Sequence, residues 1–303
     1  MIPASFTYHR PTSVPQAVAL LAELGDEARP LAGGHSLIPM MKLRLALPTH
    51  LVDLAAVSDL RGLRQQGGEI TIGAMTTQHE LIGSELVGTR LPILRETALL
   101  IADPQVRYLG TLGGNVANGD PGNDMPAVMM CLDASYAVAG SRGERRIAAR
   151  EFYHGAYFTA LEPGEIITAI HLPVPPARHG YAYEKLKRKV GDYATAAAAV
   201  VITRDGAQVT GCSIGLTNVA ETPLWAEEAG RIVVGSSLDP ATIKRATAAA
   251  EAVTAPASDN RGPASYRTRL AGVMLARALE RAAARAAARW SARASITPAI
   301  RVR

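Results

Sequence analysis

The chain has 303 residues, of which 48% are apolar and 19% are charged, and its formal net charge is +5 at pH 7. This length is enough for two domains with their own cores. No apolar stretch approaches the roughly 20 residues that a membrane-spanning helix needs. The first residues show neither the basic nor the apolar region of a secretory signal, so a cytoplasmic protein is expected.

The first 58 residues follow a pattern of short strands and helices. Ser13 and Gln16 predict a capping box, with Pro15 in the first turn, and Gly25 ends the apolar stripe that follows. A helix is therefore expected from about residue 14 to residue 24. Further elements are expected here as strands at 29–32 and 50–54 and a short helix at 37–43.

From about residue 60 the pattern shifts toward strands. Thr77 and Glu80 predict a second capping box at the start of a helix. Residues 110–126 are rich in glycine and proline and are expected to be irregular. The other expected elements are strands at 69–74, 135–139 and 165–172 and a helix at 91–101.

A proline-rich linker at 173–177 gives the strongest boundary signal in the chain. Beyond it, Asp205-Gly206 predicts a hairpin between two strands. Antiparallel strands followed by grouped helices favour an α+β fold over a doubly wound sheet. The expected elements are strands at 181–185, 196–202 and 208–217 and helices near 224–234, 240–253 and 266–290.

The positive charge is concentrated at the C-terminal end, where residues 264–303 hold nine arginines and one acid. Five of these arginines recur every four residues and share one helix face: Arg277, Arg281, Arg285, Arg289 and Arg293. A solvated face or a contact with an acidic partner subunit explains this stripe. A nucleic-acid surface is the alternative, although no aromatic residues are interleaved to stack on bases.

Familiar cofactor motifs are missing from the sequence. There is no G-x-G-x-x-G, no P-loop, no H-E-x-x-H and no C-x-x-C, so no metal site is predicted in this chain. The two cysteines, Cys131 and Cys212, are too few for an iron–sulfur cluster and are expected to be buried small apolar residues.

Two glycine pairs are the strongest functional signal. Gly33-Gly34 precedes Ser36, and Gly113-Gly114 lies between Thr111 and Asn115. Paired glycines permit positive φ and let backbone N–H groups face a ligand, and such a nest binds phosphate oxygens. Two nests, with Ser36, Thr111 and Asn115 as further donors, would suit the two phosphates of a dinucleotide. A simple turn is the alternative for either pair alone.

Ala32-Gly33-Gly34-His35-Ser36 and Thr111-Leu112-Gly113-Gly114-Asn115 resemble the two FAD motifs of the medium subunit of aerobic carbon monoxide dehydrogenases and of the flavin domain of xanthine dehydrogenases. The segment from Lys185 to Thr195 extends the resemblance. It implies a two-part FAD-binding domain of the vanillyl-alcohol-oxidase/xanthine-dehydrogenase type at 1–175, divided near residue 58. A smaller α+β domain of the carbon monoxide dehydrogenase flavoprotein type would follow at 178–290, with a tail at 291–303.

The resemblance also implies the site. The FAD pyrophosphate would lie between the two loops, the first of which would include Leu37 and Ile38. Asp124 would hydrogen-bond the cofactor, with an Asx turn before Pro126 as the alternative. Ile101 and Ile167 would be apolar flavin contacts or else core residues. Lys185 would place a cation near the flavin pyrimidine and stabilise its anionic reduced form; an exposed strand lysine is the alternative.

Tyr193 would stand near one face of the isoalloxazine and shield N5, which makes it the candidate for gating. The passage Asn118-Gly119-Asp120-Pro121-Gly122 departs from the run of small residues that is usual there in the family. A half-buried tyrosine without a function is the alternative for Tyr193.

The implied function is FAD-mediated electron transfer within a molybdenum hydroxylase. Partner chains would be a large molybdopterin subunit and a small subunit with [2Fe-2S] clusters, assembled as an (LMS)2 dimer of heterotrimers. Quinone, NAD or O2 would be the acceptor, and carbon monoxide, an aldehyde, a purine or another N-heterocycle the substrate. Peripheral membrane association of the complex stays open. A self-sufficient FAD-dependent oxidoreductase of the same superfamily is the alternative.

Overall fold

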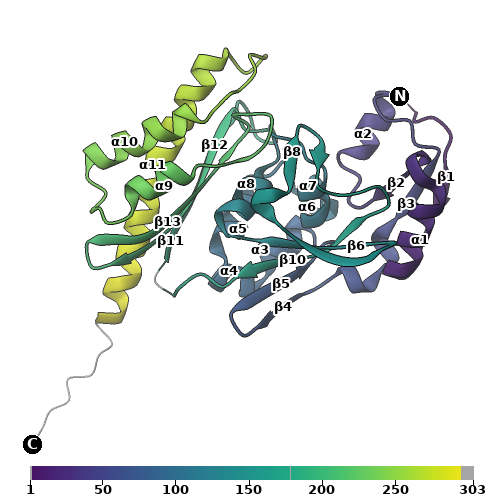
Figure 1. Cartoon of the computed structure of the whole chain (residues 1–303), viewed down its shortest axis with the longest axis horizontal. Helices are drawn as coiled ribbons and strands as arrows, with labels where there is room; N and C mark the ends of the chain where they lie inside the picture. The colour runs from purple at the N-terminus through teal and green to yellow at the C-terminus, as the bar shows by residue number, and fades with distance from the viewer. Residues whose placement is uncertain (1, 178, 295–303) are drawn as a thin grey trace, which may run out of the picture.

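The computed structural model describes residues 2–177 and 179–294, and the side chains up to residue 288. The chain forms three parts in a row, each built around its own sheet (Figure 1). Helices and strands are mixed in all three, and the α+β prediction is confirmed.

The N-terminal part is a small parallel sheet of order β1-β3-β2 with two helices. Ser13 caps α1 by accepting from the N–H of Gln16, and Gly25 ends it at φ 54°. The Gln16 side chain reaches back to the N–H of Thr12, not of Ser13, so the predicted cap is confirmed but the box is not reciprocal. The elements are β1 (Thr7–His9), α1 (Val14–Leu24), η1 (Gly25–Glu27), β2 (Ala28–Leu31), α2 (Leu37–Lys42) and β3 (His50–Asp53).

The central part is an antiparallel sheet of order β4-β5-β10-β6-β7 with six short helices. The capping box of Thr77 and Glu80 is confirmed at the start of α3. The sheet strands are β4 (Leu63–Gln66), β5 (Glu69–Gly73), β6 (Ser135–Gly140), β7 (Gly143–Ala148) and β10 (Ile166–Pro173). The helices are α3 (Gln78–Gly83), α4 (Glu85–Arg90), α5 (Pro92–Leu100), α6 (Pro104–Leu109), α7 (Leu112–Ala117) and α8 (Asp124–Cys131). Smaller elements are η2 (Leu54–Ala56), η3 (Ser58–Leu60), η4 (Ala149–Glu151) and a hairpin of β8 (Tyr153–Gly155) and β9 (Phe158–Thr159).

The prediction of an irregular segment at residues 110–126 is wrong, because α7 and the start of α8 lie there. Thr111 caps α7 by accepting from the N–H of Gly114 at 3.0 Å. Pro126 stands in the first turn of α8, where a missing N–H costs no helical hydrogen bond. All eight residues of α8 are buried, so the helix carries no amphipathic stripe for a sequence pattern to reveal.

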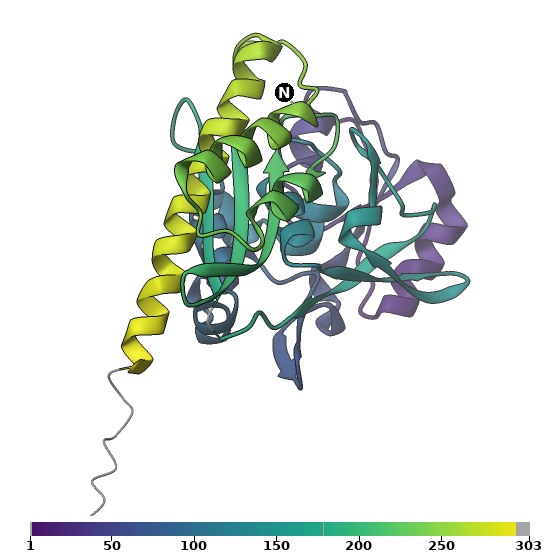
Figure 2. The same ribbon diagram turned by 60° about the vertical axis from the view of Figure 1, so that its left-hand side comes forward.

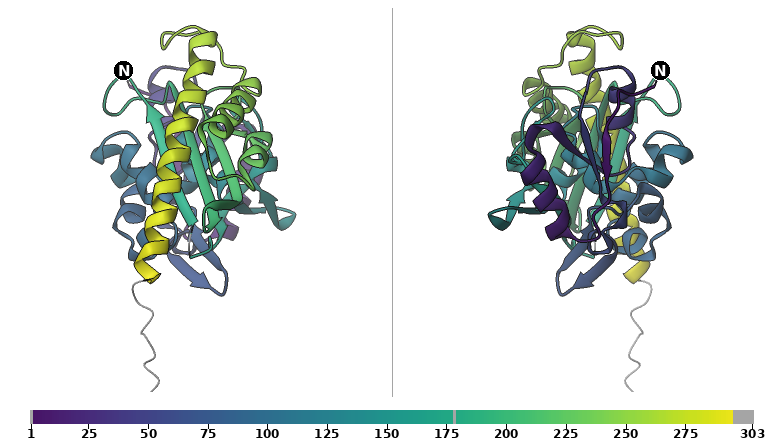
Figure 3. Two further views of the ribbon diagram at one scale, coloured as in Figure 1. Left: turned by 90° about the vertical axis from the view of Figure 1, so that its left-hand side faces the viewer. Right: turned by 90° about the vertical axis from the view of Figure 1, so that its right-hand side faces the viewer.

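The C-terminal part is an antiparallel sheet of order β11-β12-β13-β14 with helices on its outer face (Figures 2 and 3). The predicted hairpin at Asp205-Gly206 joins β12 to β13, with Gly206 at φ 55°. On the inner face, α8 packs against β12 and β13. The elements are β11 (His179–Leu186), β12 (Ala196–Asp205), β13 (Gln208–Thr217), β14 (Leu224–Trp225), α9 (Glu227–Val233), α10 (Pro240–Ala252) and α11 (Ala264–Ala294).

Part of the arginine stripe on α11 turns inward and joins the C-terminal part to α5. The carboxylate of Glu96 accepts from Arg281 at 2.5 Å and from Arg285 at 2.7 Å, and it also accepts from the backbone N–H of Tyr183 at 2.7 Å. Arg277 is exposed, and the side chains of Arg289 and Arg293 lie outside the described ones. The predictions of a solvated face and of a nucleic-acid surface are therefore wrong for Arg281 and Arg285, which bind Glu96 of the same chain.

Replacing Glu96 by glutamine is expected to lower the free energy of unfolding by about 1–2 kcal/mol. A hydrogen bond to a charged group is worth roughly 1.5–3 kcal/mol, but the two arginines are about one-third exposed, so solvent screens part of the loss. Urea denaturation measures the change. Glu144→Gln on the exposed β7 is the control, and an equal effect of both variants would contradict this role of Glu96.

Candidate functional site

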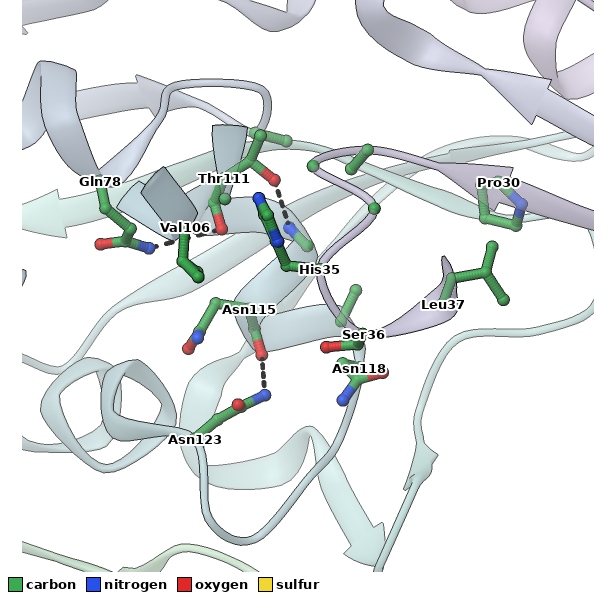
Figure 4. Close-up of a pocket in the computed structure, with 18 of the residues that line it drawn as sticks. Pro30, His35, Ser36, Leu37, Gln78, Val106, Thr111, Asn115, Asn118 and Asn123 are labelled. Atoms are coloured by element: carbon green, nitrogen blue, oxygen red, sulfur yellow. Dashed lines mark hydrogen bonds between the residues drawn. The ribbon is translucent and has the colours of Figure 1, made fainter. Parts of the chain in front are cut away.

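A cleft of about 620 Å³ lies where the N-terminal and central parts meet, and β11 and the loop after it close one side. Figure 4 shows side chains of both glycine segments around it. Of the predicted site residues, fifteen line the cleft: Ala32, Gly33, Gly34, His35, Ser36, Leu37, Ile101, Thr111, Gly113, Gly114, Asn115, Asp124, Ile167, Lys185 and Tyr193. Ile38 and Leu112 do not, since Ile38 is 37% exposed outside it and Leu112 is buried in the core.

The two glycine loops touch each other because their glycines lack side chains. A Cβ atom on Gly33 would lie 2.3 Å from the carbonyl oxygen of Leu109, directly before the second loop. A Cβ atom on Gly114 would lie 3.3 Å from the Cβ of Ala32. The first distance is shorter than real Cβ contacts, and the second is tighter than most of them, so the glycines allow the loops to form one continuous wall of the cleft.

The first loop presents free backbone donors. Gly34 has φ 73°, a conformation that suits glycine. Within the described chain, the N–H groups of Gly34, His35 and Ser36 donate to no other protein group. The N–H of Ile38, in contrast, donates to the carbonyl of Gly34. Three successive N–H groups after β2 therefore have no partner among the described residues, and donors of this kind can bind phosphate oxygens.

The second loop differs from the prediction of a second nest. The N–H groups of Leu112 and Gly113 donate to the carbonyls of Thr76 and Ala74, each at 2.8 Å. Those of Gly114 and Asn115 donate to Thr111 inside α7, and neither glycine has a positive φ. The expectation of backbone donors at this glycine pair is wrong: Gly113 and Gly114 serve close packing, and their N–H groups are used within the protein.

Buried amide side chains add polar groups to this wall: Asn115, which was predicted, and Gln78 and Asn123, which were not predicted as site residues. Gln78 donates to the carbonyl of Thr111 at 3.4 Å, and its Oε1 has no protein partner. Oδ1 of Asn115 is likewise buried without a partner, while Asn123 donates to the Asn115 carbonyl at 2.8 Å. Buried acceptors are normally paired, so this wall fits a ligand that carries hydroxyl or N–H donors. The capping box of Thr77 and Glu80, which encloses Gln78, was the nearby signal in the sequence.

A buried ion pair closes the inner end of the cleft. Asp124, the first residue of α8, accepts from Nζ of Lys185 at 2.7 Å and from the hydroxyl of Tyr183 at 2.5 Å. The Lys185 side chain is 1% exposed and also lies 3.4 Å from the Leu100 carbonyl. The Asx turn that was the alternative for Asp124 is therefore wrong. The exposed strand lysine that was the alternative for Lys185 is wrong as well.

Tyr193 stands at the mouth of the cleft and is 42% exposed. Its ring packs on Gly122, where an added Cβ would lie 2.7 Å from the ring carbon Cδ1. The nearby Tyr157 donates its hydroxyl to Asp120 at 3.0 Å. Burial and the Asp120 charge raise the pKa of Tyr157 to about 12 and also raise the pKa of Tyr193. Tyr157 was not predicted, because nothing in its local sequence relates it to the glycine loops.

The two cysteines lie away from the cleft; Cys131 is buried as predicted, whereas Cys212 is only partly buried. Burial raises the pKa of its thiol to about 12, so it is protonated at neutral pH. Among the described residues, no group of three or more His, Cys, Asp and Glu side chains is arranged to hold a metal ion. No described helix has both the length and the apolar character that crossing a membrane requires.

Stability is expected to fall by several kcal/mol between pH 10 and about pH 12. Burial raises the pKa of Tyr136, Tyr153, Tyr157, Tyr183 and Tyr193 above the ordinary value. Below pH 10 the folded and the unfolded chain both hold these protons, and above it the unfolded chain loses them first. Tyr136, Tyr153 and Tyr183 each cost up to about 1.4 kcal/mol per pH unit, whereas solvent screening makes the contributions of Tyr157 and Tyr193 smaller, because their side chains are partly exposed. Burial lowers the pKa of Lys187. This one group makes stability rise with pH, so it offsets part of the loss that the tyrosines cause.

Denaturant unfolding at fixed ionic strength from pH 9 to pH 12 measures this slope. Tyr136→Phe is expected to make it shallower, whereas Tyr108→Phe on the exposed end of α6 serves as the control. A stability that is constant or rises above pH 10 would contradict the assignment.

Two family descriptions match successive parts of the chain. Residues 4–175 match the FAD binding domain in molybdopterin dehydrogenase, and residues 181–282 match the CO dehydrogenase flavoprotein C-terminal domain. The first match spans more than half of the chain.

Individual relatives cover nearly the whole chain. The carbon monoxide dehydrogenase medium chain of Afipia carboxidovorans is 68% identical over 280 residues, which are 92% of this chain and 97% of that one. The xanthine dehydrogenase FAD-binding subunit of Escherichia coli is 28% identical over 276 residues, covering 90% and 94%. A structure of reconstituted CO dehydrogenase from Oligotropha carboxidovorans superimposes with a TM-score of 0.93 at 67% identity, covering 94% and 100%.

Proposed function

The chain belongs to the family of FAD-binding domains of molybdopterin dehydrogenases, and from this we propose that it works as the FAD-binding medium subunit of a carbon monoxide dehydrogenase. FAD, when bound, supplies the redox chemistry, while the protein supplies binding, orientation and electrostatic tuning. The observation that carries the proposal is the contact between two glycine loops along one cleft, with three free N–H donors beside it.

We assign the diphosphate of FAD to the first loop. The free N–H groups of Gly34, His35 and Ser36 are donors of the kind that bind phosphate oxygens, and the Ser36 side chain lines the same wall. The second loop approaches from the other side, with Asn115 and the neighbouring Gln78 as partners for hydroxyl or N–H groups of the cofactor. In this assignment the backbone N–H groups of the first loop bind the charged diphosphate, and the amide side chains of Asn115 and Gln78 bind uncharged polar groups of FAD.

We assign the flavin ring to the inner half of the cleft. Ile101 and Ile167 give it apolar contacts, and both are more than nine-tenths buried. Lys185 holds a positive charge there and is paired with Asp124, which lines the same cleft. Tyr193 shields the mouth and would control access by an acceptor. A dry, fixed cation acts more strongly on its neighbour than one in water.

The proposed partners follow from what this chain lacks and from the names of its relatives. Two cysteines cannot ligate an iron–sulfur cluster, so electrons would arrive from a small [2Fe-2S] subunit, which would receive them from a large molybdopterin subunit in an (LMS)2 assembly. Quinone, NAD or O2 would accept them from this chain. Carbon monoxide is the proposed substrate of the complex, because the relative with 68% identity is a carbon monoxide dehydrogenase medium chain. The proposed domain limits remain 1–175 and 178–290.

The test is to purify the full chain and measure its flavin content and its turnover alone and with the two partner subunits. We expect about one FAD per chain, no CO oxidation by the chain alone, and CO-dependent acceptor reduction by the reconstituted complex. Turnover of an organic substrate by the isolated chain would favour a self-sufficient oxidoreductase. A chain that binds no FAD would contradict the proposal altogether.

A further inference from the structure

The hydroxyl of Tyr183 makes the closest polar contact of the buried ion pair. Tyr183 is 1% exposed, and its hydroxyl lies 2.5 Å from Oδ1 of Asp124 and 3.4 Å from Oγ1 of Thr217. It does not line the cleft. The other carboxylate oxygen, Oδ2, is held by Lys185 at 2.7 Å. The two oxygens of Asp124 therefore have separate, fully buried partners.

Tyr183 and Lys185 belong together by strand geometry. Residues two apart on a strand project from the same face, so both side chains of β11 point toward the start of α8. Both backbone groups of Tyr183 are held, since its N–H donates to Glu96 at 2.7 Å and its carbonyl accepts from Arg281 at 2.7 Å. The strand position and the carboxylate orientation are thus set before any ligand enters the cleft.

We infer that Tyr183 is a positioning residue: it fixes the orientation of the Asp124 carboxylate so that Oδ2 holds the Lys185 ammonium at the wall of the cofactor cleft. Without the hydroxyl, Oδ1 loses its closest donor in a site that water does not reach. The carboxylate then turns both oxygens toward the ammonium and shifts it from its position at the wall of the cleft. The inference rests on the proposed function, because the displacement of the ammonium changes the midpoint potential of bound FAD.

Tyr183→Phe tests the inference, because it removes one oxygen and keeps the ring. We expect FAD to bind with little change in its oxidised form, whereas the reduced form, which carries more negative charge, binds about tenfold more weakly. By linkage, the two-electron midpoint potential of bound FAD falls by about 30 mV. Spectroelectrochemistry of the purified full chain measures the potential. Tyr136→Phe is the matched control, since Tyr136 is equally buried but pairs with Tyr153 away from the cleft.

A double-mutant cycle separates positioning from a direct effect. If Tyr183 acts through Lys185, Tyr183→Phe shifts the potential in the native background and produces no further shift in a Lys185→Met background. Equal shifts in both backgrounds, or none in either, would overturn the inference. If Tyr183→Phe does not fold, Thr217→Val removes only the second partner of the same hydroxyl; a smaller shift in the same direction supports the inference and no shift overturns it. Failure of the native chain to bind FAD would instead reject the proposed function.

Discussion

Replacing Gly33 by alanine is expected to raise the dissociation constant of FAD at least about a hundredfold, equivalent to roughly 2.8 kcal/mol. The new Cβ would lie 2.3 Å from the Leu109 carbonyl oxygen and 2.7 Å from the Cα of Gly110. Both obstacles are backbone atoms, so no side chain can rotate to make room. The two loops must separate, and the first loop then turns its free N–H groups away from the cleft.

Fluorescence titration of the apoprotein with FAD measures this effect. Gly68→Ala is the matched control, because Gly68 is exposed, has no positive φ and has no atom within 4 Å of an added Cβ. Gly114→Ala is expected to weaken binding less, since part of its conflict is with the Thr111 side chain. Full FAD occupancy in Gly33→Ala would refute the role given to the contact between the loops.

Replacing Lys185 by methionine is expected to lower the free energy of unfolding by about 3–5 kcal/mol. The substitution leaves the Asp124 carboxylate buried with Tyr183 as its remaining close partner, and breaking a buried pair costs more than the pair contributes. The same substitution removes the cation beside the proposed flavin position, so the midpoint potential of bound FAD falls as well.

A second substitution separates these two effects. Lys185→Met combined with Asp124→Asn is expected to recover much of the lost stability, because no uncompensated charge remains, but to leave the potential low. Lys244→Met on the exposed face of α10 is the control. Denaturant unfolding and spectroelectrochemistry give the two readouts. A loss of stability below about 1 kcal/mol for Lys185→Met would contradict the buried pair.

Elements with a clear period or cap could be predicted from the sequence. The helix after Ser13, the capping box at Thr77 and the hairpin at Asp205-Gly206 each depend on neighbours within a few residues. Helix α8 could not be found this way, because it is buried on all sides and contains a proline. Its place depends on packing between the central part and the C-terminal sheet, which no local pattern records.

The site shows the same limit. The two glycine loops stand out in the sequence, but the sequence does not show why each position requires glycine. Position 34 has a positive φ, whereas at positions 33, 113 and 114 a Cβ atom would collide with neighbouring atoms. The resemblance placed Asp124 and Lys185 at the cofactor separately. Their pairing with Tyr183 joins residues about sixty positions apart and emerges only when β11 lies beside α8.

A crystal structure of the full chain with FAD tests the central claim most directly. We predict that the diphosphate lies within hydrogen-bond distance of the N–H groups of Gly34, His35 and Ser36, with the isoalloxazine between Lys185 and Tyr193. A diphosphate bound elsewhere, or a first loop whose N–H groups face away from it, would contradict the assignment of this cleft.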